Sequence, residues 1–204
     1  MAEITAQLVK QLRDRTGAGI MECKGALQEA NGDVTEAEVV LRKRGIASAA
    51  KKSARSTKAG LVGSYIHPGA QLGVLVEVNC ESDFVARTEE FVSLVHDIAM
   101  HIAASDPQFV RKEDVTAAAI EKERDIQRAR ALAEGKPEKI LDKIVEGRME
   151  KFYAQVCLLD QAFIRDEDLT LNDVINGVMG KLGEKIGVRR FVRYRVGEPL
   201  YSVQ

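Results

Sequence analysis

The sequence predicts an α+β protein in which helical segments flank a short stretch of strands. Three observations support this class. Residues 5–45 carry apolar side chains at helical spacing between glycine-containing joints. Residues 61–79 change to a period of two, which is typical of strands. Residues 113–156 return to helical spacing on both sides of one Gly135-Lys136-Pro137 turn. Helices and strands that occupy separate stretches of the chain favour this class.

The N-terminal segment is predicted to form a compact bundle of three short helices. Thr5 and Thr35 are the candidate caps of the first and third helices. The second helix covers Met21–Ala30 and ends at an Asn31-Gly32-Asp33 turn, and the third is expected to end near Gly45. A bundle of this size lies near the lower limit of independent stability.

A basic stretch follows, and its function is open from the sequence alone. Residues 41–60 contain no acidic residue and carry Arg42, Lys43, Arg44, Lys51, Lys52, Arg55 and Lys58. One interpretation is a solvated connecting helix or partly ordered linker, and the other is a patch that binds phosphate groups.

The strand region predicts a hairpin that leads into a helix. Leu61–His67 and Gln71–Asn79 are the expected strands around Pro68-Gly69, and Val74, Val76 and Val78 share one face. Ser82 or Asp83 is expected to cap the following helix. Its three- and four-residue spacing predicts that the inward positions are Phe84, Val85, Phe91, Leu94, Val95, Ile98 and Ile102.

The remaining chain predicts a helical hairpin followed by a return to the core. Residues 113–156 form an antiparallel coiled coil whose inward residues include Ile120, Ile126, Leu132, Leu141, Ile144, Val145, Met149, Phe152 and Val156. Cys157–Ile164 is expected to be a strand, Asp173–Leu182 a helix and Val188–Val196 the last strand.

Composition excludes several classes of protein. Lys and Arg number 30 and Asp and Glu 31, and this balance argues against a dedicated nucleic-acid binder. Three widely spaced cysteines without a C-x-x-C pair predict a reducing compartment. The sequence shows neither a signal peptide nor an apolar run of about 20 residues, so we expect a soluble, cytoplasmic protein that does not bind membranes.

The sequence offers little catalytic chemistry, and we expect no enzyme activity, metal or cofactor. His96 and His101 are five residues apart, which is unsuited to a shared metal on one helix face. Cys80 precedes two acidic residues, Glu81 and Asp83, which would raise its pKa. Gly17-Ala18-Gly19 lacks the third glycine of a dinucleotide-binding loop. The alternatives are a thiol hydrolase that uses Cys80 and an RNA- or ribosome-associated adaptor that uses residues 41–60.

The segment Ser82-Asp83-Phe84-Val85 is the unusual local feature. The first interpretation is that Asp83 caps a helix and Phe84 packs into the core. The second is that Phe84 is an exposed anchor that enters an apolar crevice of a partner, while the Asp83 carboxylate supplies charge beside it.

Four motifs resemble those of the elongation factor Ts family and follow its order over nearly the whole chain. Leu12–Leu27 resembles the N-terminal signature, and Val78–Arg87 resembles the second signature. Glu134–Pro137 with Ile144–Arg148 is similar to the coiled-coil hairpin of the family. Lys181–Ile186 with Val188–Arg190 is similar to its C-terminal core signature.

This resemblance implies a guanine-nucleotide exchange factor for the translational GTPase elongation factor Tu, in its GDP-bound and nucleotide-free states. It implies a ubiquitin-associated-like helical domain at 1–55 and an α+β core at 56–112 and 157–204. A coiled-coil hairpin at 113–156 interrupts that core. Because the chain resembles the short form of the family, the resemblance also implies a homodimer whose core sheets associate.

The resemblance assigns contacts residue by residue. Asp83 and Phe84, within the magnesium-displacing segment Ser82–Val85, match the pair that inserts between two helices of the GTPase. The other matched contact positions are Arg13, Ile20, Met21, Lys24, His67, Ile164, Leu182 and Gly183. Ser82 replaces the usual Thr and keeps the capping oxygen, whereas Gly25 replaces a Lys within a predicted helix.

Overall fold

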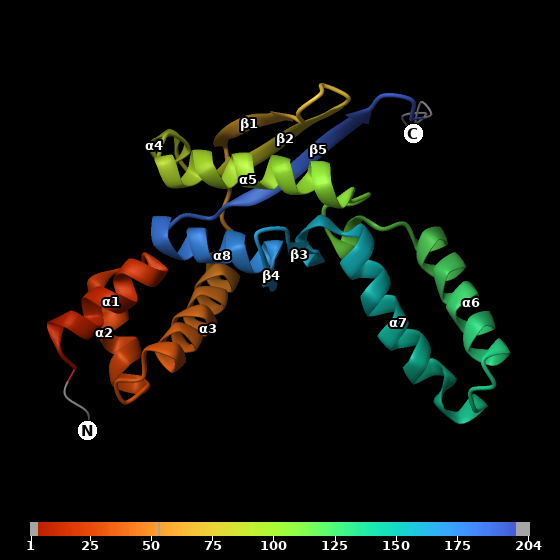
Figure 1. The fold of residues 1–204 in the computed structure, drawn as a ribbon, viewed down its shortest axis with the longest axis horizontal. Helices are drawn as coiled ribbons and strands as arrows, with labels where there is room; N and C mark the ends of the chain where they lie inside the picture. Colours follow the sequence, from red (N-terminus) through yellow and green to blue (C-terminus); the bar gives the residue numbers. More distant parts are fainter. Residues whose placement is uncertain (1–3, 53, 199–204) are drawn as a thin grey trace. The chain divides into compact units, whose positions relative to one another are not determined.

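The computed structural model describes residues 4–52 and 54–198 and shows the helices and small sheets expected of an α+β protein (Figure 1). Contacts divide the described residues into two compact units. The first contains parts of Met1–Val62, Glu77–Val95 and Asp173–Gly187, and the second contains parts of Gly63–Val76, His96–Asn172 and Val188–Gln204. Within the described ranges, no helix is both long and apolar enough to cross a membrane.

Three helices form the N-terminal part of the first unit: α1 (Ala6–Thr16), α2 (Ile20–Glu29) and α3 (Val34–Lys52). Thr5 caps α1 as predicted, because its side chain accepts a hydrogen bond from the Leu8 N–H. Gly17 ends α1 in the left-handed conformation at a φ of 64°. The helices enclose a small apolar core of Val9, Leu12, Cys23, Ala26, Leu27, Ala30, Ala37 and Val40.

The third helix differs from the prediction at both ends. Asp33, and not Thr35, caps it, because the Asp33 carboxylate accepts the Glu36 N–H at 2.8 Å. The helix also continues past Gly45 to Lys52. Its continuation is stabilised by α8 (Leu171–Leu182), to which Lys52 donates a hydrogen bond at the Met179 carbonyl. Tertiary contacts therefore override the local stop signal of one glycine.

The main sheet has the strand order β1-β2-β5, so β2 is central and β1 and β5 are its edges. The strands are β1 (Ala59–Ile66), β2 (Leu72–Cys80) and β5 (Gly187–Arg195), each within two residues of the predicted bounds. Val74, Val76 and Val78 are buried on one face, as the alternation predicted.

The predicted helix after β2 is two helices, α4 (Asp83–Ala86) and α5 (Glu89–Ser105). Ser82 caps the first, and the Thr88 hydroxyl accepts the Phe91 N–H at the start of the second. The inward positions from Val85 to Ile102 are buried as predicted, but Phe84 is 82% exposed. Because the helix breaks between α4 and α5, the spacing of the inward residues of α5 does not extend back to Phe84. The prediction that Phe84 faces inward was therefore wrong.

The predicted hairpin consists of α6 (Ala117–Ala133) and α7 (Leu141–Val156), with a short 3-10 turn, η2 (Glu138–Ile140), between them (Figure 1). Leu141, Val145, Met149 and Val156 of α7 are buried as predicted. In α6 the fully buried residue is Ala131, whereas Ile126 and Leu132 are exposed. A small side chain allows two helices to approach closely, which explains why alanine, and not leucine, faces α7 here.

The segment after the hairpin was predicted incorrectly as one strand over Cys157–Ile164. It contains a short 3-10 turn, η3 (Leu158–Asp160), and the two-residue strand β3 (Ala162–Phe163). Strand β3 pairs with β4 (Asp166–Thr170), which the sequence analysis missed. The Leu158 and Leu159 N–H groups donate to the Phe109 and Val110 carbonyls, so these apolar residues satisfy their backbone outside a regular strand. Another short 3-10 turn, η1 (Lys112–Asp114), precedes the hairpin.

Candidate partner-binding surface

Helix α4 presents one aromatic side chain to solvent while burying the two residues after it. Phe84 is 82% exposed and Asp83 is also exposed, whereas Val85 and Ala86 are each 4% exposed. Exposing the apolar ring of a Phe to water costs free energy, which a partner that covers the ring would recover. Of the two interpretations of this segment, the geometry favours the exposed anchor.

The turn that carries Phe84 is fixed from its N-terminal side by Ser82. The Ser82 hydroxyl accepts the Val85 N–H at 3.4 Å, which is the capping bond of α4. The Cys80 thiol donates to the Ser82 carbonyl at 3.2 Å. The helix therefore starts at one defined residue, and the direction of the Phe84 side chain follows from it.

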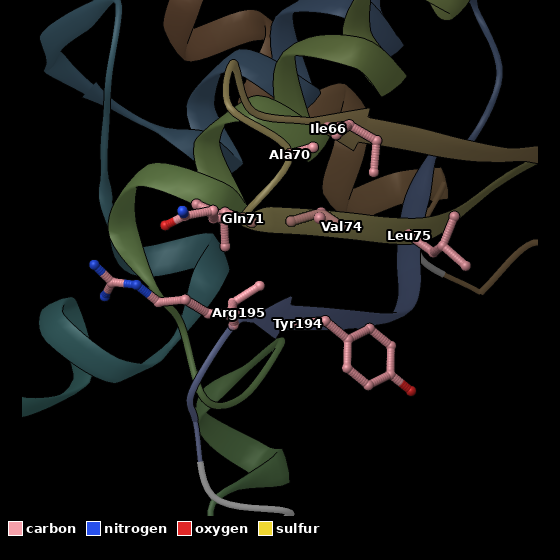
Figure 2. Close-up of a pocket in the computed structure, with 10 residues that line it drawn as sticks. Ile66, Ala70, Gln71, Val74, Leu75, Tyr194 and Arg195 are labelled. Carbon is pink, nitrogen blue, oxygen red and sulfur yellow. The ribbon is translucent and has the colours of Figure 1, made fainter.

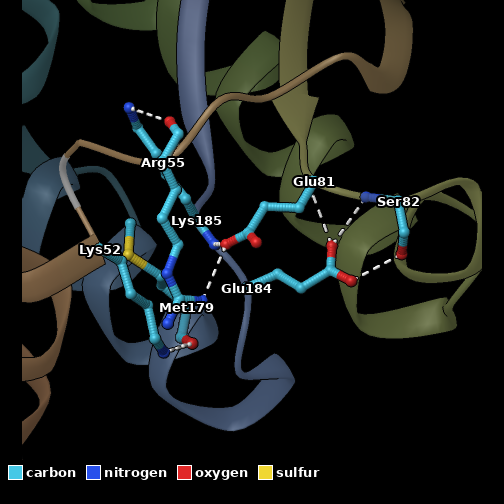
Figure 3. Close-up of polar contacts among 7 residues, drawn as sticks. All are labelled: Lys52, Arg55, Glu81, Ser82, Met179, Glu184 and Lys185. Carbon is cyan, nitrogen blue, oxygen red and sulfur yellow. Dashed lines mark hydrogen bonds and ion pairs between the residues drawn. The ribbon is translucent and has the colours of Figure 1, made fainter.

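Two carboxylates connect this segment to the residues between α8 and β5 (Figure 3). Glu184 accepts hydrogen bonds from the Glu81 N–H at 3.1 Å, the Ser82 N–H at 3.0 Å and the Ser82 hydroxyl at 2.6 Å. In the opposite direction, Glu81 accepts the Lys185 N–H at 2.6 Å. Each segment thus supplies a carboxylate to the backbone of the other.

The Glu81 carboxylate is also held in its charged form. The hydrogen bond from the Lys185 N–H lowers the pKa of Glu81, partial burial opposes that effect, and the Arg55 guanidinium lowers the pKa further. Arg55 lies 3.2 Å from a Glu81 oxygen, and Lys185 in turn donates to the Arg55 carbonyl at 2.9 Å. Glu81 is therefore a charged acceptor at neutral pH.

Cys80 is unsuited to nucleophilic chemistry. Its side chain is buried, and burial together with the nearby Glu184 and Asp83 carboxylates raises the pKa of its thiol. The prediction of a raised pKa is correct, although Glu184, and not Glu81, is the leading charge. A buried thiol that stays protonated at neutral pH argues against the thiol hydrolase.

The predicted contacts of the N-terminal bundle all lie at its surface. Ile20 and Met21, at the start of α2, are 55% and 76% exposed. Arg13 and Lys24 are exposed as well. Two large exposed apolar side chains, with the basic Lys24 one turn further along α2, form a surface that suits a protein partner.

The remaining predicted positions have less uniform surroundings. In the first unit Leu182 is half-buried, and Gly183 is exposed and adopts a φ of 75° directly before Glu184. In the second unit Ile164 is half-buried, and His67 is exposed, with its Nδ1 3.1 Å from the Tyr65 hydroxyl. Leu182 and Gly183 thus directly precede Glu184, the residue that binds Ser82.

Comparison with known proteins identifies the family. The sequence profile of the family described as Elongation factor TS matches residues 18–198. The chain belongs to the elongation factor Ts family. A protein named Elongation factor Ts from Solibacter usitatus is 70% identical over 198 residues, which cover 97% of this chain and 93% of that protein. The protein of the same name from Desulforamulus reducens is 60% identical over 204 residues, covering 100% and 94% of the two chains.

Membership of the elongation factor Ts family confirms the resemblance predicted from the four motifs. This family comprises the nucleotide exchange factors of elongation factor Tu. Glu184 and Lys185 lie within the fourth of those motifs, but their position beside Ser82 was not predicted. No local pattern in the sequence signals this contact, because Glu184 is 102 residues from Ser82.

The structure gives the basic stretch an internal role that weakens the adaptor alternative for this family member. Arg42 pairs with Asp173 at 2.9 Å and Arg44 with Glu29 at 2.7 Å. Lys52 is buried against the Met179 carbonyl, and Arg55 pairs with Glu81. Three of these cations thus form ion pairs and Lys52 binds a carbonyl, all with partners within the first unit.

The histidines do not form a metal site in the part of the chain that the structure describes. His96 is exposed, whereas His101 is fully buried with its Nε2 3.1 Å from the Gln161 amide oxygen. Within residues 4–52 and 54–198, no three His, Cys, Asp or Glu side chains cluster as metal ligands.

Proposed function

We propose that this chain is a guanine-nucleotide exchange factor that binds elongation factor Tu–GDP in the cytoplasm and promotes GDP release during translation elongation. The observation that carries the proposal is the 82% exposed Phe84 beside Asp83, in a chain of the elongation factor Ts family. Phe84 enters between two helices of the GTPase near its magnesium site, and Asp83 places competing negative charge there. The Ser82–Val85 segment is thus the magnesium-displacing element.

The mechanism requires differential binding and no bond-making step by this chain. The factor must bind the GTPase more tightly when GDP and magnesium are loosened, and by reciprocity it then weakens GDP by the same factor. A shift from 1:99 to 99:1 requires about 5.5 kcal/mol of differential affinity. Burial of one Phe side chain supplies about 1.5–3 kcal/mol, so further contacts are required.

Those further contacts come from the residues that match the family. Ile20 and Met21 are the apolar contribution of the N-terminal bundle, and Arg13 and Lys24 add charge around them. The core contributes His67, Ile164, Leu182 and Gly183, which the resemblance assigns to the partner. The exposed apolar area at Ile20 and Met21 supports this assignment.

The deciding experiment measures the release of fluorescently labelled GDP from elongation factor Tu by stopped flow. The chain should accelerate release strongly, and Phe84→Ala should abolish most of that acceleration. The stability of the variant should be unchanged, because the exposed Phe84 side chain contributes little to the apolar core of the chain. Val39→Ala is the matched control, since Val39 is a 38% exposed apolar side chain outside the proposed contacts. Equal stimulation by the Phe84→Ala protein would refute the insertion mechanism.

We also propose that the chain forms a homodimer through the outer face of its main sheet, in keeping with the short form of the family. In the second unit, Ile66 of β1, Leu75 of β2 and Tyr194 of β5 are 63%, 49% and 70% exposed. They line a shallow, mostly apolar groove together with Val196 (Figure 2). A second copy that presents the same face would cover these side chains by two-fold symmetry.

The oligomeric state tests the dimer. Light scattering after size-exclusion chromatography should give the mass of two chains, and Leu75→Asp should give that of one. Val92→Asp is the control, because Val92 is 48% exposed, like Leu75 at 49%, but lies on α5 and not on the sheet. A monomeric wild-type protein, or a dimer that survives Leu75→Asp, would contradict the proposed interface.

A further inference from the structure

The Asp83–Phe84 turn has little of its own packing to hold it in place. Helix α4 has only four residues, and the side chain at its centre is 82% exposed. A short helix in water does not persist through its backbone bonds alone. Apart from the buried Val85 and Ala86, the position of Phe84 therefore depends on the groups that fix the start of α4.

Glu184 makes most of the polar bonds that fix that start. One of its oxygens accepts both the Glu81 and Ser82 N–H groups, and the other accepts the Ser82 hydroxyl at 2.6 Å. The hydroxyl that donates to Glu184 is the same group that accepts the Val85 N–H and caps α4. Glu184 thus sets the orientation of the capping oxygen as well as the backbone before it.

A second carboxylate makes the arrangement reciprocal. Glu81 accepts the Lys185 N–H at 2.6 Å, so the residues that flank Glu184 are fixed by the segment that Glu184 itself holds. Two segments more than 100 residues apart in sequence are joined by four bonds to carboxylates. Charge-assisted hydrogen bonds of this kind are short and strongly directional.

We propose that Glu184 is a positioning residue for nucleotide exchange, which holds the Asp83–Phe84 turn in the conformation that inserts into the GTPase. This inference rests on the proposed exchange function. A turn that is ordered before binding loses less conformational entropy when the partner covers it, so the clamp strengthens binding without touching the partner. Glu184 acts through the hydrogen bonds that it accepts from the turn, and not through a charge presented to the partner.

Substitution of Glu184 separates these roles. Glu184→Ala removes both oxygens that accept the three hydrogen bonds. It should lower the stimulated GDP-release rate, at a subsaturating factor concentration, about tenfold. Glu184→Gln keeps an amide oxygen for the two N–H groups and an amide nitrogen that can donate to the Ser82 hydroxyl. It should retain the rate to within about threefold. If Glu184→Gln lost as much as Glu184→Ala, the charge would be the cause and the positioning role would be refuted.

A double-mutant cycle shows whether Glu184 acts through Phe84. If it does, Glu184→Ala should slow exchange in the wild-type background but have no further effect in the Phe84→Ala background. Additive losses would mean that Glu184 acts elsewhere. Glu29→Ala is the matched control, because it removes an ion pair with Arg44 in the same unit but no bond to the turn. Its exchange rate should stay at the wild-type value.

A measurement on the free protein makes the inference independent of exchange. The Glu81 and Ser82 N–H groups donate to Glu184, so their hydrogen exchange, followed by NMR, should be at least about tenfold faster in Glu184→Ala. Unchanged protection of these N–H groups would refute the positioning role of Glu184, even if the variant stimulated GDP release less. If the wild-type protein fails to accelerate GDP release from elongation factor Tu, the proposed function is wrong, and the protection data still decide whether Glu184 holds the turn.

Discussion

Gly60 should be the least replaceable glycine of the β1–β2 hairpin. It has a φ of 146°, and a Cβ added there would lie 2.2 Å from the Val78 carbonyl oxygen and 2.8 Å from the Asn79 Cα. Carbon and oxygen atoms normally approach to about 3.3 Å, so the Gly60→Ala methyl overlaps the neighbouring strand by about 1 Å. Both obstructing atoms are backbone, so no side-chain movement relieves the overlap.

The expected loss of stability is the sum of two effects. A non-glycine residue in this conformation costs about 1–3 kcal/mol. Moving β1 away from its hydrogen-bonded neighbour β2 weakens sheet hydrogen bonds, which adds about 2 kcal/mol. The total of about 3–5 kcal/mol is a large share of the roughly 5–15 kcal/mol that typically stabilises a folded protein. For a chain of this size, Tm should fall by about 6–20 °C.

Thermal unfolding followed by circular dichroism measures this loss, and Gly69→Ala is the control. Gly69 also has a positive φ, 93°, but nothing lies within 4 Å of its added Cβ. Gly69→Ala therefore reports the conformational strain alone, and Gly60→Ala should destabilise by about 2 kcal/mol more. If the free energies of unfolding of the two variants differed by less than about 1 kcal/mol, β1 would move aside at little cost, and the reasoning from the close contact would be refuted.

Two further predictions concern stability. Burial lowers the pKa of His101, so the unfolded state binds a proton more readily, and the free energy of unfolding should fall as pH drops below about 6.5, by at most about 1.4 kcal/mol per pH unit. Urea unfolding between pH 5 and 7 should show this dependence, and His101→Phe should flatten it; an equally steep variant would contradict it. Gly25→Ala should stabilise α2 by about 1 kcal/mol, because its Cβ would meet only the end of the flexible Arg44 side chain, at 3.2 Å. A lower urea midpoint would contradict that expectation.

The elements that sequence predicted best are those whose signals are local. Thr5 caps α1 and Pro68-Gly69 forms the hairpin turn, because capping and turn formation involve residues only a few positions apart. Strand β4 was missed because it lacks such a local signal. Its residues Asp166, Glu167 and Asp168 are exposed, so the strand carries no apolar alternation. Pairing with β3 defines it, and pairing is not visible in the spacing.

The candidate site shows why a hydrophobic pattern alone misplaces its central residue. Periodicity assigns Phe84 to the same face as Phe91 only if one continuous helix joins them. Thr88 starts a new helix, so the phase of α5 does not extend back to Phe84. The family motif indicated the exposed position, but Glu184, which holds the turn, is 102 residues from Ser82. Only the fold brings that carboxylate to the turn, so the anchor could be predicted from sequence and its support could not.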